Sequence, residues 1–166
     1  MAAWVALSAL ANGELVDNRA YPLPVIDQTS GADSLVSTPA VRLARSQDEF
    51  ANLWLSHRGG PNSLPGVGFQ TQPMPQLDFR RVMVVAAFAG EVPNSGAFRY
   101  VSGVKQGKLS TIRLAYQPMA GIAAIQGRPF TFFVIPRAET KVQIDLVEGQ
   151  RIRTVAEFGA LEKKRN

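Results

Sequence analysis

The chain has one histidine, His57, and no cysteine, so it offers few of the side chains on which catalytic sites are most often built. A hydrolase that used His57 as its general base would need a nucleophile beside it and a carboxylate to orient the ring. Asp78 and Glu91, at the two ends of a long apolar segment, are the acids considered for such a site. An extended strand between them would keep them far apart, and no G-x-S-x-G motif is present. We therefore predict no catalytic residue, and keep as an alternative a hydrolase with an unfamiliar site around these three residues.

Metal and cofactor sites are not predicted either. The acidic residues are dispersed, without the D-x-D-x-D-G spacing of a calcium loop, and the lack of cysteine excludes thiolate-bound zinc. Gly66-Val67-Gly68 is not followed by the third glycine or the helix start of a phosphate-binding loop. We expect no metal and no cofactor.

The charge balance is basic, with a formal net charge of +5. Such a surface attracts acidic proteins, nucleic acids and anionic lipids. The arginines are spread through the chain, which favours solvated side chains on strand faces. A nucleic-acid-binding module is the main alternative function, and it requires the arginines to converge on one face, for example Arg99 and Arg113 beside Tyr100 and Tyr116. A carbohydrate- or ligand-binding sheet is a further possibility, with few exposed aromatic residues to support it.

The most specific local feature is a turn that follows the long apolar segment. Proline and then Asn-Ser-Gly favour a tight turn, in which Gly96 is free to adopt a positive φ angle. A structural turn and a binding loop are both consistent with this pattern. The binding residues that we predict from the turn and from nearby arginines are Pro93, Asn94, Ser95, Gly96, Phe98, Arg99, Arg113 and Arg128.

One helix is clearly indicated after residue 46. Ser46 is a good N-cap, and Glu49 stands three residues later, as in a capping box. Gly59 ends the helix. The face that the helix would bury consists of Phe50, Leu53, Trp54 and His57.

Most of the remaining order is predicted to be β-strand. Residues 81–89 form a nearly continuous apolar run, typical of a strand buried on both faces. Gln106-Gly107 and Glu148-Gly149 mark hairpin turns between alternating segments, while residues 58–76 and 117–128 read as loops. These patterns predict an α+β domain with one helix packed on a largely antiparallel sheet of about six strands.

The first part of the chain is predicted to be irregular. Residues 12–38 are rich in proline and read as an arm laid across the domain. Residues 2–11 are apolar and end in an A-x-A pattern, so they are either a signal remnant or an ordinary N-terminal helix. The predicted division is residues 1–38 as the N-terminal segment, 39–155 as the domain and 156–166 as a basic tail. No segment approaches the roughly 18 apolar residues that a membrane-spanning helix needs.

Several of these motifs together resemble the C-terminal domain family of the protease-complex subunit PrcB, over about residues 40–145. In order they are the helix 46–54, Leu77-Asp78-Phe79 before the strand 82–86, Gly90, the turn 93–98 and the strand 129–136. Asn94 and Ala97 depart from the family's turn pattern. The resemblance implies an exported bacterial protein whose domain associates with a partner such as a protease.

The expected function is therefore that of a non-catalytic accessory domain of the bacterial envelope, periplasmic or secreted. If residues 1–11 are not a signal remnant, the expected location is the cytoplasm. In this interpretation the turn 90–96, the loop 58–76 and the arginines dock an acidic patch of the partner, which raises specificity and association rate.

Overall fold

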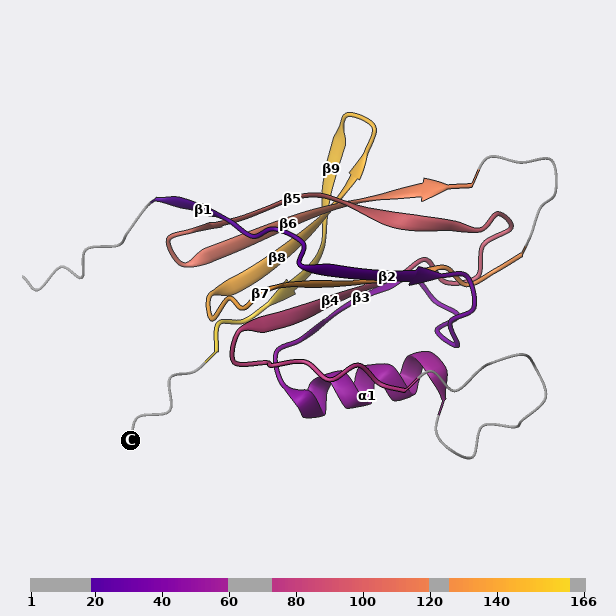
Figure 1. The fold of residues 1–166 in the computed structure, drawn as a ribbon. Helices are drawn as coiled ribbons and strands as arrows, with labels where there is room; N and C mark the ends of the chain where they lie inside the picture. The colour runs from indigo at the N-terminus through magenta and orange to yellow at the C-terminus, as the bar shows by residue number, and fades with distance from the viewer. Residues whose placement is uncertain (1–18, 60–72, 120–125, 162–166) are drawn as a thin grey trace, which may run out of the picture.

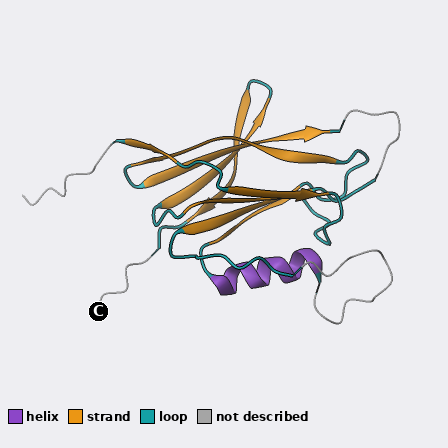
Figure 2. Ribbon diagram, viewed as in Figure 1, coloured by secondary structure: helices purple, strands orange, loops and turns teal. Residues whose placement is uncertain are grey.

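The fold is α+β, as predicted, and the computed structural model describes residues 19–59, 73–119 and 126–161 (Figures 1 and 2). These residues form one helix and nine strands. In chain order the elements are β1 (Ala20–Pro22), β2 (Asp27–Gly31), β3 (Ala40–Ala44), α1 (Gln47–Arg58), β4 (Val82–Phe88), β5 (Gly96–Gln106), β6 (Leu109–Pro118), β7 (Phe130–Pro136), β8 (Lys141–Glu148) and β9 (Arg151–Phe158).

The strands form two sheets, where the sequence predicted one sheet of about six strands. A five-stranded sheet has the order β1-β5-β6-β8-β9, and a four-stranded sheet has the order β2-β7-β4-β3. All neighbours pair antiparallel except β6 and β8, which are parallel. Turn signals locate hairpins correctly, but they do not say which sheet a hairpin enters, because that depends on pairing between distant segments.

The four-stranded sheet is the middle layer, with the five-stranded sheet on one face and α1 on the other (Figure 1). Its central strand β4 is accordingly buried on both faces, as its apolar run predicted. Met83, Val85 and Phe133 belong to the core between the sheets, whereas Val84 and Phe132 belong to the core under the helix.

The helix begins and ends as its sequence predicted. The Ser46 hydroxyl accepts a hydrogen bond from the Glu49 backbone N–H at 3.2 Å, and the Glu49 carboxylate accepts one from the Arg45 backbone N–H. Gly59 ends the helix with φ 83°, a conformation that favours glycine. The predicted face is confirmed, since Phe50, Leu53 and His57 are buried and Trp54 is partly buried.

The proline-rich arm is more ordered than its sequence indicated. Its described part contributes β1 to the five-stranded sheet and β2 to the four-stranded sheet, so the chain crosses between the sheets and covers one side of the sandwich. Leu23, at the crossing, is 5% exposed, and full burial of a leucine side chain stabilises by about 2 kcal/mol. The Tyr100 hydroxyl donates a hydrogen bond to the Leu23 carbonyl, and burial raises the pKa of Tyr100 to about 12. Pairing with β5 and β7, not local propensity, makes these residues extended.

The strands extend on both sides of residues 39–155. The sheets include β1 and β2, which lie before residue 39, and β9 continues to Phe158. The predicted signal remnant and most of the loop 58–76 lie outside the described residues.

Candidate binding cleft

The side of the sandwich opposite the arm is bordered by two edge strands, β3 of one sheet and β9 of the other. The two strands are fastened together at one end by Arg45, whose side chain is buried. Its Nη1 donates to the Gly159 carbonyl at 2.6 Å and its Nη2 to the Thr140 carbonyl at 2.7 Å. At the other end of β3 the two edges are separated by a cleft.

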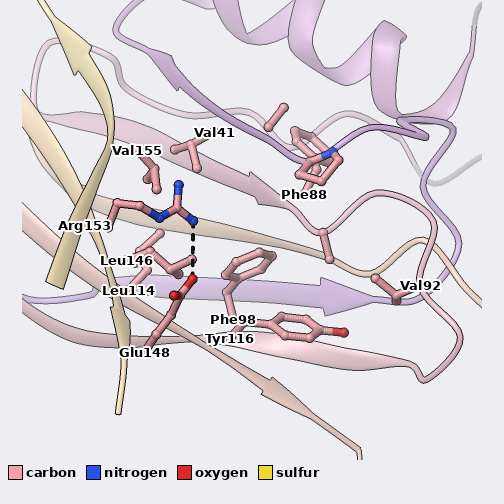
Figure 3. Close-up of a pocket in the computed structure, with 13 residues that line it drawn as sticks. Val41, Phe88, Val92, Phe98, Leu114, Tyr116, Leu146, Glu148, Arg153 and Val155 are labelled. Carbon is pink, nitrogen blue, oxygen red and sulfur yellow. Dashed lines mark hydrogen bonds and ion pairs between the residues drawn. The ribbon is translucent and has the colours of Figure 1, made fainter. Parts of the chain in front are cut away.

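The cleft has a volume of about 360 Å³ and mostly apolar walls (Figure 3). One wall comes from β3, β4 and the residues just after β4, and the other comes from the five-stranded sheet. The labelled apolar residues of Figure 3 are Val41, Phe88, Val92, Phe98, Leu114, Leu146 and Val155. Because these side chains come from several separate strands, the cleft exists only in the folded chain.

Two polar features lie in the lining. The Tyr116 hydroxyl donates to the Asn94 carbonyl at 3.3 Å, and partial burial raises the pKa of Tyr116. Arg153 and Glu148 form an ion pair of 3.3 Å, and Figure 3 shows the two side chains reaching toward each other. Their side chains are 64% and 54% exposed, so this pair contributes little to stability and is free to rearrange when a ligand arrives.

The predicted turn borders this cleft. Phe98 forms part of the wall, and its ring lies 5.1 Å from that of Tyr116. Pro93 and Asn94 are exposed, whereas Ser95 is buried and its carbonyl accepts a hydrogen bond from the Met119 N–H at 2.7 Å. The turn is thus fixed at two points, to Tyr116 of β6 and to Met119 directly after it.

Gly96 does not have the positive φ angle that the sequence suggested. It is the first residue of β5, and a Cβ atom there would lie 2.5 Å from the Gln117 carbonyl oxygen and 2.7 Å from the Tyr116 hydroxyl. Close approach of β6, rather than turn geometry, is what favours glycine. The glycine with positive φ in this region is Gly90, at 73°.

The three predicted arginines do not line the cleft. Arg99 follows Phe98 along β5 and therefore points to the opposite face of the sheet. Arg113 points to that outer face too, where its Nε lies 3.9 Å from the Asp145 carboxylate. Arg128 pairs with Glu91 at 3.8 Å. Arg99 and Arg113 therefore face away from the cleft that Phe98 lines, whereas Arg128 lies beside the turn, next to the Val92–Gly127 bridge.

Sequence reasoning did not identify Val41, Leu146 and Val155 as site residues. The alternation around Leu146 predicts a strand face, but nothing local tells a cleft wall from a core position. Val155 lies at a register shift of β9, where it has no Cα partner in β8. That irregularity is not encoded by a recognisable motif.

The residues of the hydrolase alternative have separate surroundings. His57 is fully buried and its Nδ1 lies 2.9 Å from the Ser34 hydroxyl. Asp78 pairs with Arg80 at 3.0 Å, and Glu91 lies beyond the other end of β4. The seven-residue β4 alone is about 20 Å long, so the two acids are not neighbours.

Two further findings concern the described residues only. They contain no group of three or more histidine, aspartate or glutamate side chains placed to hold a metal ion. Among them, α1 is the only helix, and it is not long and apolar enough to cross a membrane.

No family model, no curated protein and no solved structure matches this chain. The geometry of the cleft, the edge strands beside it and the charges around it are therefore the basis for a functional proposal.

Proposed function

We propose that this chain is a non-catalytic binding domain of the bacterial envelope, and that it holds a partner protein in the cleft between β3 and β9. The observation that carries the proposal is the cleft itself, an apolar hollow of about 360 Å³ on the side of the sandwich opposite the arm. Protein interfaces combine an apolar, desolvated centre with a polar rim. The cleft offers the partly exposed Val41 and Val155 for the centre and the Arg153–Glu148 pair for the rim.

The volume of the cleft suits anchoring side chains of a partner protein rather than a whole small-molecule ligand. Pockets for drug-sized molecules measure about 300–1,000 Å³, and this cleft is near the lower limit. Binding energy in protein interfaces is concentrated in a few side chains that enter such pockets. One or two apolar side chains of a partner fit this description.

The net charge of +5 supports an acidic partner. Complementary charge accelerates association and rejects partners of like charge, even when it adds little to affinity. Arg42, on β3, and Arg151, on β9, are exposed and have no ion-pair partner within the described part of the chain.

The arrangement of the arginines gives less support to nucleic-acid binding. Arg58, Arg80 and Arg128 are each engaged by a carboxylate among the described residues. Arg99 and Arg113 lie on the outer face of the five-stranded sheet, whereas Arg45 is buried directly after the last residue of β3. A nucleic-acid interface would need these charges on one face.

A photo-crosslinking experiment tests the proposal. A photoreactive phenylalanine analogue replaces Val41 in the cleft or, as a matched control, Val104, which lines a hollow of similar volume, about 370 Å³, on the outer face of the five-stranded sheet. Irradiation in the envelope fraction should give a discrete protein adduct from position 41 and none from position 104. A protease is the first partner to look for, because of the PrcB resemblance.

Competition makes the result specific. An excess of the unmodified chain should compete for the partner and abolish the adduct. An excess of the Val155→Trp variant should not abolish it, because the tryptophan ring fills the cleft. A folded Val155→Trp variant that competes as well as the unmodified chain would contradict the proposal, as would an absence of adducts at position 41.

A further inference from the structure

The sandwich has four edge strands among its described residues, and they differ in how well they are protected from pairing with another chain. Free edges are usually protected by being short, by proline, by bulges or by charged side chains. β1 has only three residues and ends in Pro22. β2 is polar and exposed along its length, and β9 contains a register shift at Val155.

β3 is the least protected of the four. It pairs with β4 in unbroken register over all five of its residues, from Ala40 opposite Phe88 to Ala44 opposite Val84. Its only charged residue is Arg42, which apolar residues flank on both sides. Within the described residues, no backbone hydrogen bond from another segment reaches its outer edge.

The alternation places different chemistry on the two faces of β3. Val41 and Leu43 point into the space between the sheets, and Val41 lines the cleft. Arg42 points to the opposite face and is exposed. A strand added outside β3 would therefore send alternate side chains toward the space between the sheets and the intervening side chain beside Arg42.

We propose that an extended segment of the partner protein adds to β3 as a further strand of the four-stranded sheet. Its recognition pattern is apolar–acidic–apolar, with one apolar side chain in the cleft beside Val41, the other beside Leu43, and a carboxylate paired with Arg42 across the strands. This inference rests on the proposed function and specifies how the partner is held. Main-chain hydrogen bonds supply affinity in strand addition, and side-chain pockets supply specificity.

The fastening by Arg45 limits the length of the added strand. Arg45 follows Ala44 directly and joins β3 to Gly159 and Thr140, so the edge is closed at that end. Residues 40–43 remain for pairing, which suits a short linear segment rather than a whole sheet.

The opposite side of the sandwich contains a comparable arrangement. There the chain's own residues 23–26 connect β1 of one sheet with β2 of the other and place the Leu23 side chain in the interior. A short segment with apolar anchors, Leu23 and Val25, therefore covers one side, and the partner segment would cover the other in a similar way.

A second copy of this chain is a poor occupant. Antiparallel pairing of β3 with β3, centred on Arg42, would place two arginines directly opposite each other, and like charges in this position are destabilising. An acidic segment would instead place a carboxylate opposite Arg42, and such a pair of opposite charges is stabilising.

The test uses two short synthetic peptides that differ only in their central residue, Val-Glu-Val in one and Val-Lys-Val in the other. The full chain should bind the glutamate peptide roughly fivefold more tightly than the lysine peptide, and Arg42→Glu should reverse this preference. Arg99→Glu, an equal charge change on the outer face of the other sheet, should leave the preference unchanged. Amide hydrogen exchange should slow in β3 on binding, and not in β9.

Each other outcome overturns the inference. Binding to neither peptide, a preference that Arg42→Glu does not reverse, slower exchange at β9 alone, or dimerisation of the chain through β3 would each do so. If the adduct at position 41 is nevertheless obtained, the proposed function stands and only strand addition fails. If neither result is obtained, both fail.

Discussion

Ser34 and His57 are joined by a hydrogen bond of 2.9 Å between Oγ and Nδ1 in the interior of the fold. The two residues come from the loop before β3 and from the last turn of α1. Rings of Phe88, Phe130 and Phe132 surround the imidazole, and its Nε2 has no hydrogen-bond partner within the described residues. The contact fixes the helix to the loop with an uncharged histidine.

This environment makes stability depend on pH. Burial, reinforced by the nearby positive charge of Arg58 and opposed by Asp33, lowers the pKa of His57 from 6.5 to about 4. Below pH 6.5 the unfolded chain binds a proton that the folded chain excludes. The free energy of unfolding should therefore fall by about 3 kcal/mol in total between pH 6.5 and pH 4, and this contribution should be constant above pH 7.

Urea unfolding at a series of pH values measures this change. Because the chain has a single histidine, His57→Gln removes the whole histidine contribution and should flatten the curve in this interval. If the variant does not fold, nuclear magnetic resonance titration of the one imidazole in the unmodified chain gives its pKa directly. A value near 6.5 would contradict the prediction.

Ser34→Ala should destabilise the fold by about 1–3 kcal/mol, because it leaves buried polar groups unpaired. The Ser34 hydroxyl also accepts a hydrogen bond from the Val36 N–H at 3.1 Å, so the loop loses a contact as well. Ser37→Ala, at an exposed position nearby, is the matched control and should change stability by less than about 0.5 kcal/mol. Chemical denaturation of both variants checks this, and equal effects would exclude a special role for Ser34.

Gly96→Ala should destabilise the start of β5 and distort the cleft beside Tyr116. The added Cβ would meet the Gln117 backbone oxygen at 2.5 Å, and backbone cannot move aside cheaply. Gly159→Ala is the control, since no atom lies within 4 Å of its Cβ position. Because alanine restricts the unfolded chain, that variant should be unchanged or stabilised by up to about 1 kcal/mol. Thermal unfolding should separate the two, and a neutral Gly96→Ala would refute the close-approach explanation.

Arg45→Gln should weaken the attachment of the end of β3 to the residues around Thr140 and Gly159. The variant loses charged hydrogen bonds to the Gly159 and Thr140 carbonyls, and a loss of about 2–4 kcal/mol is expected. Amide hydrogen exchange should accelerate around residues 140 and 159. Arg42→Gln, an exposed arginine of the same edge, should leave both quantities almost unchanged. Equal acceleration in the two variants would show that Arg45 does not hold these strands together.

Glu148→Gln should change stability by less than about 1 kcal/mol, because the ion pair with Arg153 is exposed on both sides. The same change releases Arg153 at the cleft mouth, so an acidic peptide should bind at least as tightly as before. Urea unfolding and peptide titration of the one variant measure both effects. A large loss of stability would mean that the pair holds the β8–β9 hairpin together.

The parts of the fold that were predictable are those whose signals are local. The apolar run of β4 indicated burial on both faces, and Ser46, Glu49 and Gly59 marked the limits of α1. Each of these patterns acts over a single element. The glycines at both hairpin turns acted in the same way, with φ angles of 55° for Gly107 and 62° for Gly149.

What could not be predicted depends on pairing between distant segments. Ala20 pairs with Gln106 and Asp27 pairs with Val134, so the arm becomes strand only once β5 and β7 are in place. Phe98, predicted as a binding residue because it follows a recognisable turn, lies in the cleft wall, and its role in binding stays a prediction. Arg99 was grouped with it by proximity in sequence, although adjacent residues of a strand face opposite ways.

The parallel pairing of β6 and β8 has a consequence for the order in which the protein can fold. Between these strands the chain leaves the five-stranded sheet, adds β7 to the other sheet and then returns. On the ribosome, β6 therefore has only one neighbour until β8 emerges, and β4 lacks one of its neighbours until β7 does. Such late, non-local contacts slow folding and leave apolar strand edges open meanwhile. We expect this chain to depend on chaperones during synthesis more than a helical protein of the same length.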